Sequence, residues 1–128
     1  MPGVLKTVSP YNRGPGHFCV GASDYDRSRE TVTIAAAAPA MVAGQLLGKI
    51  TASGKFTVYD PAAVDGTETF AGLLWDDVAD AAADQKAVRV YRDQPVNGNA
   101  LAGYSALTTP QKTALIAAAK AMGIIILF

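Results

Sequence analysis

The 128-residue sequence is short of cysteine, of aromatic residues and of excess charge. Its single cysteine, Cys19, cannot form a disulfide within the chain, which excludes a disulfide-stapled secreted scaffold. Aromatic residues make up only 8% of the sequence, so small aliphatic side chains have to build most of the core. Lys plus Arg equals Asp plus Glu at 11 each, so there is no surplus of positive charge to bind a phosphate backbone. We expect no direct contact with nucleic acid.

Long apolar runs are also missing. Residues 123–128 are apolar, but this run is far shorter than the roughly 20 residues that a membrane-spanning helix needs. The start of the chain holds Lys6 and Arg13 among prolines and glycines, without the apolar stretch of a signal peptide. We therefore expect no membrane partner, no export signal and a reducing compartment.

The first 28 residues differ in composition from the rest of the chain. Prolines and glycines are dense there, which opposes both helix and sheet. The apolar residues among them are too dispersed to form a core, yet too numerous for an inert spacer. The sequence predicts a flexible N-terminal arm over residues 1–28 and one β-rich domain over residues 29–128. An arm that orders on a partner and a disordered tail without a role are both open at this point.

Short alternations of apolar and polar residues, each closed by Gly, Asp or Pro, predict several β-strands. Residues 45–61 indicate two strands joined by a tight turn at residues 52–54. Residues 96–100, which contain an Asn-Gly pair, predict a second hairpin turn, of type I′. The acidic segment 76–85 is expected to be a solvated loop or a helical turn. The other predicted strands cover residues 30–35, 70–74 and 87–93.

One helix is predicted near the end of the chain. It should begin after residues 108–110, where a Thr cap and an early Pro mark a start, and run to about Met122 before Gly123. Residues 124–128 are β-branched or apolar throughout, which predicts a terminal strand buried on both faces or at a subunit contact. The predicted fold class is mainly β with one C-terminal helix, a small barrel-like domain with an extended N-terminal arm.

Residues with catalytic or metal-binding chemistry are scattered along the sequence. His17 and Cys19 are each the only residue of their type and lie in the predicted arm, whereas a metal site needs about four ligands held rigidly. The glycine-rich stretch 48–55 is better explained as a hairpin than as a phosphate loop, because no helix follows it. Turns or solvated loops better explain Asp60, Asp65, Glu68, Asp76, Asp77, Asp80, Asp84 and Ser105. We expect no enzyme, no cofactor and no metal.

The strings Ser28-Arg-Glu-Thr-Val-Thr-Ile34, Gly44-Gln-Leu-Leu-Gly-Lys-Ile-Thr51, Ser53-Gly-Lys-Phe56, Tyr59-Asp-Pro-Ala-Ala63, Asp65-Gly66 and Ala71-Gly-Leu-Leu74 follow one another along the chain. In this order and spacing they resemble the head decoration proteins of tailed bacteriophages, the lambda D-like family. The resemblance covers roughly residues 28–128 and ends in the helix and Gly123-Ile-Ile-Ile126.

The resemblance implies a small β-rich fold, the β-tulip, that trimerises on the outside of the expanded capsid at local three-fold positions. There it stabilises the capsid as a cement, with the major capsid protein and further copies of itself as partners. It also implies a virion protein that is made in the bacterial host cytoplasm.

In such proteins the N-terminal arm adds β structure to the major capsid protein. Extended segments with alternating side chains suit that role, because main-chain hydrogen bonds give affinity and side chains give register. The residues expected to bind the capsid are Tyr11, Phe18, Val20, Tyr25, Thr31, Val32, Thr33 and Ile34. Those expected at the trimer interface are Ile124, Ile126 and Phe128.

Two other classes stay open. One is a small-ligand or carbohydrate-binding β-barrel whose acidic loop, residues 76–84, guards a pocket; a deep pocket with convergent polar groups would favour it. The other is a hydrolase built on Asp76, Asp80 or Ser105, which would show turnover that disappears when those residues are substituted.

Overall fold

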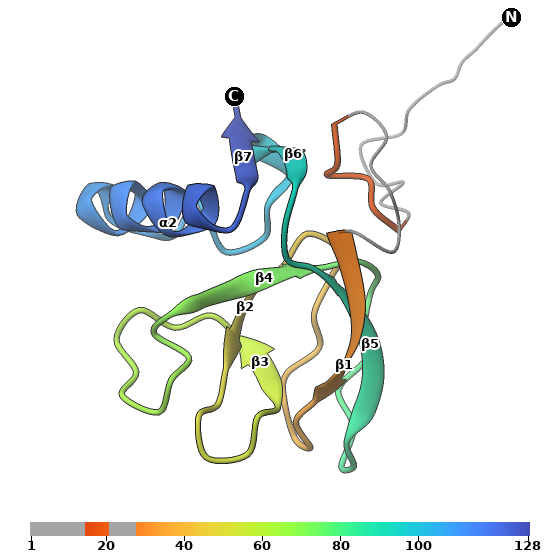
Figure 1. Ribbon diagram of the computed structural model, residues 1–128. Helices are drawn as coiled ribbons and strands as arrows, with labels where there is room; N and C mark the ends of the chain where they lie inside the picture. The colour runs from red at the N-terminus through yellow and green to blue at the C-terminus, as the bar shows by residue number, and fades with distance from the viewer. Residues whose placement is uncertain (1–14, 21–27) are drawn as a thin grey trace, which may run out of the picture.

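The alternating segments of the sequence form five short strands that close into a barrel, and a smaller layer packs against it (Figure 1). This computed structural model describes residues 15–20 and 28–128. The barrel strands are β1 (Arg29–Ile34), β2 (Leu46–Lys49), β3 (Phe56–Val58), β4 (Phe70–Leu74) and β5 (Gln85–Val90). The smaller layer, called the upper layer below, contains β6 (Gln94–Asn97), the 3-10 turn η2 (Gly98–Ala100), α2 (Thr109–Ala121) and β7 (Ile124–Leu127).

The strands follow the order β1-β3-β2-β4-β5 around the barrel. β1 pairs with β5 in antiparallel orientation along its whole length. β2 and β3 form the antiparallel hairpin predicted over residues 45–61, and the N–H of Gly54 donates to the carbonyl of Ile50 in its turn. β3 reaches β1 at a single parallel pair, Phe56 and Ile34. A long contact on one side of β1 and a single pair on the other therefore close the ring.

The remaining barrel strands lie close to their predicted places. β4 has the predicted bounds, and β1 begins one residue earlier than expected. β5 begins within the segment expected to be a loop, because Gln85 and Lys86 already pair with β1. The acidic residues before Gln85 form loops and bends, as the sequence predicts.

α2 begins and ends where the sequence indicates. The Thr108 hydroxyl accepts a hydrogen bond from the N–H of Gln111, and the Gln111 side chain accepts one from the N–H of Thr108, which together form a capping box. Gly123 has a φ of 84°, a left-handed conformation that suits glycine and ends the helix. Leu115 and Ala119 are buried on the face that packs inward.

The hairpin predicted over residues 96–100 is wrong. β6 does not turn back on itself but pairs in parallel with β7. The Asn97 side chain accepts a hydrogen bond from the N–H of Asn99 (3.0 Å) and caps η2. An Asn-Gly pair favours tight turns in general, and here a turn that leads away from the strand satisfies that preference.

Paired leucines divide the interior into two clusters, since successive side chains of a strand point to opposite faces. Leu46 and Leu73 face one cluster, whereas Leu47 and Leu74 face the other. The first, called the layer core, joins the barrel to the upper layer and contains Phe18, Ala43, Leu46, Phe70, Leu73, Val90, Val96, Leu101, Leu115, Ala119 and Ile124. The second, called the barrel core, contains Val32, Ile34, Ala38, Met41, Leu47, Phe56, Leu74 and Val78. The predicted class, mainly β with one C-terminal helix, is confirmed.

Candidate functional site

Residues 15–20, called the root segment, lie along β6 in the upper layer (Figure 1). Cys19 forms an antiparallel bridge with Val96. The N–H of Val20 donates to the carbonyl of Pro95 (2.9 Å), and the N–H of Asn97 donates to the carbonyl of Phe18 (2.8 Å). β7 pairs with the opposite side of β6, so the end of the root segment, at residues 18–20, bridges the side of β6 that β7 leaves open.

Side chains also hold the root segment in place. Phe18 is fully buried in the layer core, and its ring contacts that of Trp75 edge to face at 6.3 Å between centroids. The N–H of Gly16 donates to the carbonyl of Trp75 (2.8 Å). The buried amide of Gln94 donates to the carbonyl of Val20 (3.2 Å). The root segment is thus part of the folded body.

This placement concerns residues that the sequence assigns to the arm. Phe18, expected to bind the capsid, contacts the protein's own core, because a large aromatic side chain gains most from full burial. Val20 is 42% exposed and stays open to a partner. Tyr11 and Tyr25 lie outside the described residues. The flexible arm predicted over residues 1–28 therefore contains a packed segment in its second half.

One local signal in the sequence marks the root segment. Residues 17–20 contain neither proline nor glycine and include Phe and Val, which suit strands, whereas glycines stand on both sides. Its apolar residues look dispersed in the sequence, and no pattern there connects them to their partners Trp75 and Gln94. Those partners lie far along the chain, so only the fold brings them together.

Strand β1 contains the other residues expected to bind the capsid. Val32 and Ile34 are buried in the barrel core, where the protein's own residues cover their side chains. The Thr33 hydroxyl accepts a hydrogen bond from the Lys86 ammonium (2.9 Å). Thr31 is exposed, and because β3 pairs with β1 at Ile34, no strand of the described residues lies beside Thr31 on that edge.

Strand β7 has one buried and one exposed side. Ile124 is fully buried in the layer core, whereas Ile125 and Leu127 are 41% and 44% exposed. Ile126 is half-buried, and Phe128 after the strand is 68% exposed. Within the chain only one face of β7 is buried, so of the two predicted alternatives the subunit contact stays a prediction. The Ile124 side chain is covered by the layer core. The exposed side chains belong to the alternate positions, because side chains alternate along a strand.

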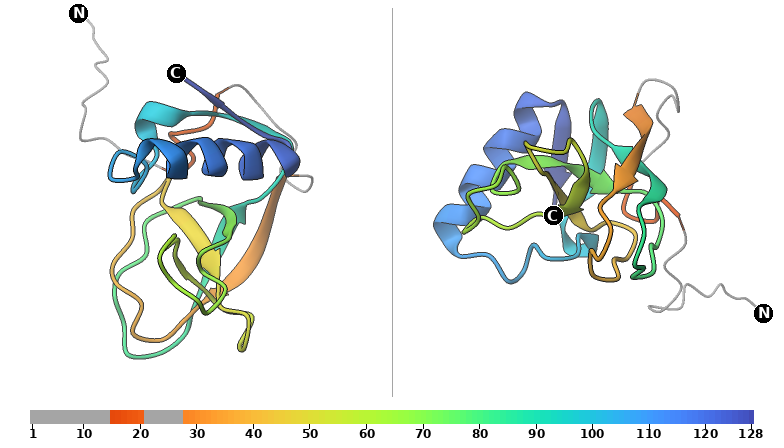
Figure 2. Two further views of the ribbon diagram at one scale, coloured as in Figure 1. Left: turned by 90° about the vertical axis from the view of Figure 1, so that its left-hand side faces the viewer. Right: turned by 90° about the horizontal axis from the view of Figure 1, so that it is seen from below.

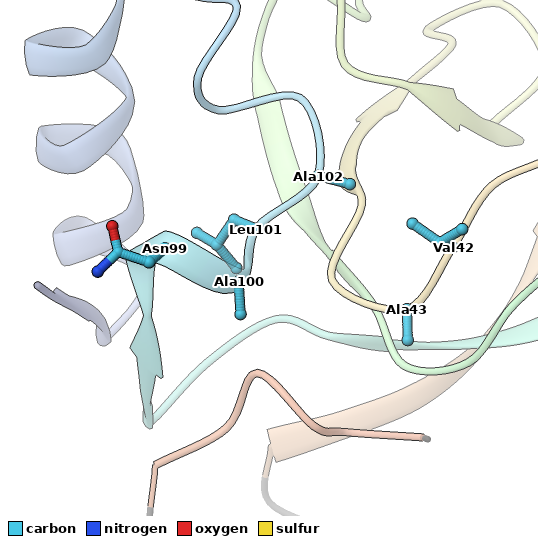
Figure 3. A pocket seen from close by; sticks show the side chains of 6 residues that line it. All are labelled: Val42, Ala43, Asn99, Ala100, Leu101 and Ala102. Carbon is cyan, nitrogen blue, oxygen red and sulfur yellow. The ribbon is translucent and has the colours of Figure 1, made fainter. Parts of the chain in front are cut away.

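Two pockets bear on the idea of a small-ligand or carbohydrate-binding barrel. One, of about 180 Å³, is lined by Val42, Ala43, Asn99, Ala100, Leu101 and Ala102 (Figure 3). The other, of about 250 Å³, lies beside the acidic loop and is lined by Trp75, Asp76, Asp77, Val78, Lys86, Ala87 and Val88. Ligand sites span roughly 300–1,000 Å³, and both pockets are smaller. The Asp77 carboxylate accepts a hydrogen bond from the N–H of Ala43 (2.8 Å), so it supports the loop before β2.

The carboxylates between β3 and β4 hold turns together. Asp60 accepts a hydrogen bond from the N–H of Ala62 (3.0 Å), and Glu68 accepts one from the N–H of Gly66 (2.8 Å). The Asp65 carboxylate accepts from the Thr67 hydroxyl at 2.6 Å, which lowers the pKa of Asp65. Within residues 15–20 and 28–128, no three His, Cys, Asp or Glu side chains group in a way that suits a metal ion.

The Cys19 thiol is held in its neutral form. Burial raises the pKa of Cys19 from 9.0 to about 11, and the positive charge of Arg29 opposes this shift. A neutral thiol is a poor nucleophile and a poor metal ligand, so Cys19 acts here as a packed side chain of the root segment. In the part of the chain that the structure describes, no helix has the length and apolarity to cross a membrane.

Comparison with known protein families covers most of the chain. The chain matches the family described as Bacteriophage lambda head decoration protein D over residues 10–124. The chain belongs to this family. The match includes the root segment, the whole barrel and the upper layer up to the first residue of β7. A search of curated proteins gave no match.

Membership in this family confirms the resemblance seen in the short strings of the sequence. The chain is a structural, non-enzymatic head decoration protein of the phage capsid surface. The described residues leave strand edges without a neighbouring strand at Thr31 of β1 and along the outer side of β7.

Proposed function

We propose that this decoration protein trimerises on the outer surface of the expanded capsid, at local three-fold positions, and stabilises the shell against the pressure of packaged DNA. Family membership supports the capsid as its place of action. The root segment supports the role of the arm. Because residues 15–20 are hydrogen-bonded to β6, the arm leaves the body at one defined place.

In this proposal the residues before Pro15 bind the major capsid protein by adding a strand to an edge of one of its sheets. Main-chain hydrogen bonds would provide most of the affinity of such a contact. Tyr11 is the aromatic residue of this part of the arm, and Tyr25, between the root segment and β1, is a second candidate contact. Phe18 anchors the arm to its own body, and Thr31 offers a further contact on the open edge of β1.

Three arms on one trimer make the attachment durable. Each docked arm raises the effective concentration of the next, and such linkage increases overall affinity by about 10²–10⁴ without any new contact. The gain depends on a short connection between body and binding segment. The packed root segment shortens that connection in this proposal, because the body then reaches to Pro15 and the binding segment directly precedes it.

Removal of residues 1–14 tests the arm and leaves the root segment in place. We expect the shortened protein to keep the oligomeric state and melting temperature of the full chain in solution, and to lose co-sedimentation with expanded capsids. The full-length protein is the matched control. Attachment at full strength without residues 1–14 would overturn the arm mechanism, and a single-chain mass for the capsid-bound protein would overturn the trimer.

Stabilisation of the shell is tested separately. Expanded capsids that lack the protein should break open at a lower temperature than decorated ones, and addition of the purified protein should restore their resistance. Equal resistance of bare and decorated capsids would contradict the stabilising role.

A further inference from the structure

The Asn97-Gly98 pair at the end of β6 can modify itself chemically. In such a pair the main-chain nitrogen of the glycine loses its proton to a base and attacks Cγ of the asparagine side chain. A C–N bond forms and closes a five-membered imide ring, while the side-chain nitrogen leaves Cγ as ammonia. Water then opens the ring to aspartate or to isoaspartate, which has one extra carbon in its main chain. Glycine favours the attack because it has no side chain to obstruct the nitrogen.

The packing around η2 favours glycine at position 98. Gly98 is buried, and an added Cβ would be too close to the Phe128 ring and would lie 2.8 Å from a methyl group of Ile126. A larger residue would therefore push these side chains aside, which costs stability. The fold thus keeps a chemically reactive pair because of the space available at Gly98.

The main chain of Asn97 is held in a conformation from which the ring cannot close. Its ψ is 110°, an extended value, so the nitrogen of Gly98 points away from Cβ of Asn97. Ring closure needs these two atoms on the same side of the Cα–C bond. The Asn97 side chain is also fixed, because its oxygen accepts a hydrogen bond from the N–H of Asn99 (3.0 Å). The attack therefore requires that this cap opens and that the main chain rotates.

Neighbouring segments on both sides of β6 oppose that rotation. The N–H of Asn97 donates to the carbonyl of Phe18 in the root segment (2.8 Å), and Asn97 lies opposite Leu127 of β7. Figure 2 shows the end of β6 beside the end of β7 from two further directions. The Asn97 side chain is exposed to water, whereas Gly98 is buried, so a base reaches the N–H of Gly98 only after the turn opens.

We infer that Asn97 is a site of spontaneous deamidation that the docked root segment and the η2 cap keep unreactive in the folded protein. Opening of the upper layer makes the site reactive. Conversion to isoaspartate lengthens the main chain between β6 and η2, so the turn no longer fits against β7 and the layer cannot close as before. This inference goes beyond the proposed function and does not depend on it, because it concerns the free protein.

Comparison of the folded and the unfolded chain tests the inference. The unmodified protein is incubated at mildly alkaline pH with and without guanidinium chloride, and mass spectrometry of its peptides follows the conversion of each asparagine. We expect Asn97 to react at least about tenfold more slowly in the folded protein, because only the small open fraction reacts. Asn99, which precedes Ala100, is the internal control, and in guanidinium chloride it should react more slowly than Asn97.

Phe18→Ala tests the role of the root segment. Loss of the buried ring should release the segment and accelerate the reaction of Asn97 under native conditions by at least about tenfold, toward the rate of the unfolded chain. Val20→Ala changes a 42% exposed residue of the same segment and should keep the slow rate. Labelling of the Cys19 thiol with a maleimide shows whether the segment has left the layer. If Phe18→Ala does not fold, the two states of the unmodified protein still decide the inference.

Three results would overturn the inference. The first is an equal rate at Asn97 in the folded and the unfolded protein. The second is a rate at Asn97 in the unfolded chain that is no higher than the rate at Asn99. The third is a slow reaction of Asn97 in Phe18→Ala while Cys19 is fully labelled. Since no capsid is present in these measurements, a failure of capsid binding would leave their outcome unchanged.

Discussion

The barrel and the upper layer differ in how their strand edges are paired. In the barrel, β1 pairs with β5 along its length and β3 returns to β1 at Ile34, so the sheet closes on itself. In the upper layer, a segment from the start of the chain bridges β6, and no strand of the described residues lies on the outer side of β7. Closure removes strand edges, whereas an open sheet keeps them. The two regions therefore differ in how much strand edge the described residues leave unpaired.

The largest effect should come from Phe18→Ala, which tests whether the root segment belongs to the layer. We expect the free energy of unfolding to fall by about 3–5 kcal/mol, because a fully buried ring leaves a cavity in the layer core. Urea denaturation measures the loss. Val20→Ala on the same segment is the control, and should cost less than about 1 kcal/mol at a 42% exposed position.

Labelling of Cys19 shows whether the root segment leaves the layer in Phe18→Ala. Undocking of the root segment in Phe18→Ala should expose the thiol and accelerate its reaction with a maleimide. Unchanged stability and unchanged labelling would mean that the root segment is not fixed to the layer in solution, and the contrast between layer and barrel would lose its main support.

Thr108→Ala tests the helix that covers the layer core. The loss of the capping hydrogen bond to Gln111 should reduce the free energy of unfolding by about 1 kcal/mol. Thr113→Ala removes a hydroxyl that donates to the carbonyl of Thr109 in the helix interior, and should cost less. Equal losses in the two variants would show that the cap does not determine the stability of α2.

High pH should weaken the layer before the barrel. The unfolded chain loses the thiol proton of Cys19 near pH 9.0, whereas the folded protein keeps it up to about pH 11. Stability from this group is therefore complete below pH 9.0 and declines as the pH rises toward 11. A comparison of urea midpoints between Cys19→Ser and the unmodified protein isolates this contribution. A parallel decline of the urea midpoint in both proteins would assign the loss of stability at high pH to other groups.

The smallest effect concerns the far end of the barrel. The Lys55 ammonium lies 2.7 Å from the Asp84 carboxylate, which also accepts from the N–H of Ala36, and both contacts lower the pKa of Asp84 below 3.8. Stability from Asp84 is present above pH 3.8 and is lost as the pH falls through the lowered value. Asp84→Asn should make acid unfolding slightly less steep, with a smaller effect than Thr108→Ala. An unchanged acid profile would show that these exposed contacts contribute nothing.

Local patterns predicted the barrel well. Alternation gave β4 its bounds, and the Thr cap and Gly123 located α2, because these signals depend on neighbours in the sequence. The paired leucines of β2 and β4 have a role that appears only in the fold, since both faces of these strands are buried.

The upper layer could not be predicted in the same way. Five consecutive apolar residues at 124–128 contain no polar residue to mark the exposed face, so the sequence could not show that Ile124 is buried while Ile125 and Leu127 are exposed. The Asn-Gly pair indicated a hairpin, but the partner of β6 lies beyond a whole helix. Likewise, Phe18 packs in the layer core beside Trp75, and no local sequence pattern connects these two residues.

The fixed root segment sets a tether length for the proposed arm. Tyr11 precedes Pro15 by four residues, and a fully extended chain spans at most about 3.6 Å per residue, so the Cα of Tyr11 can lie no farther than about 14 Å from that of Pro15. In the proposed mode of binding, a capsid residue that Tyr11 touches would therefore come close to Pro15, and the body of each copy would sit almost flush with the shell.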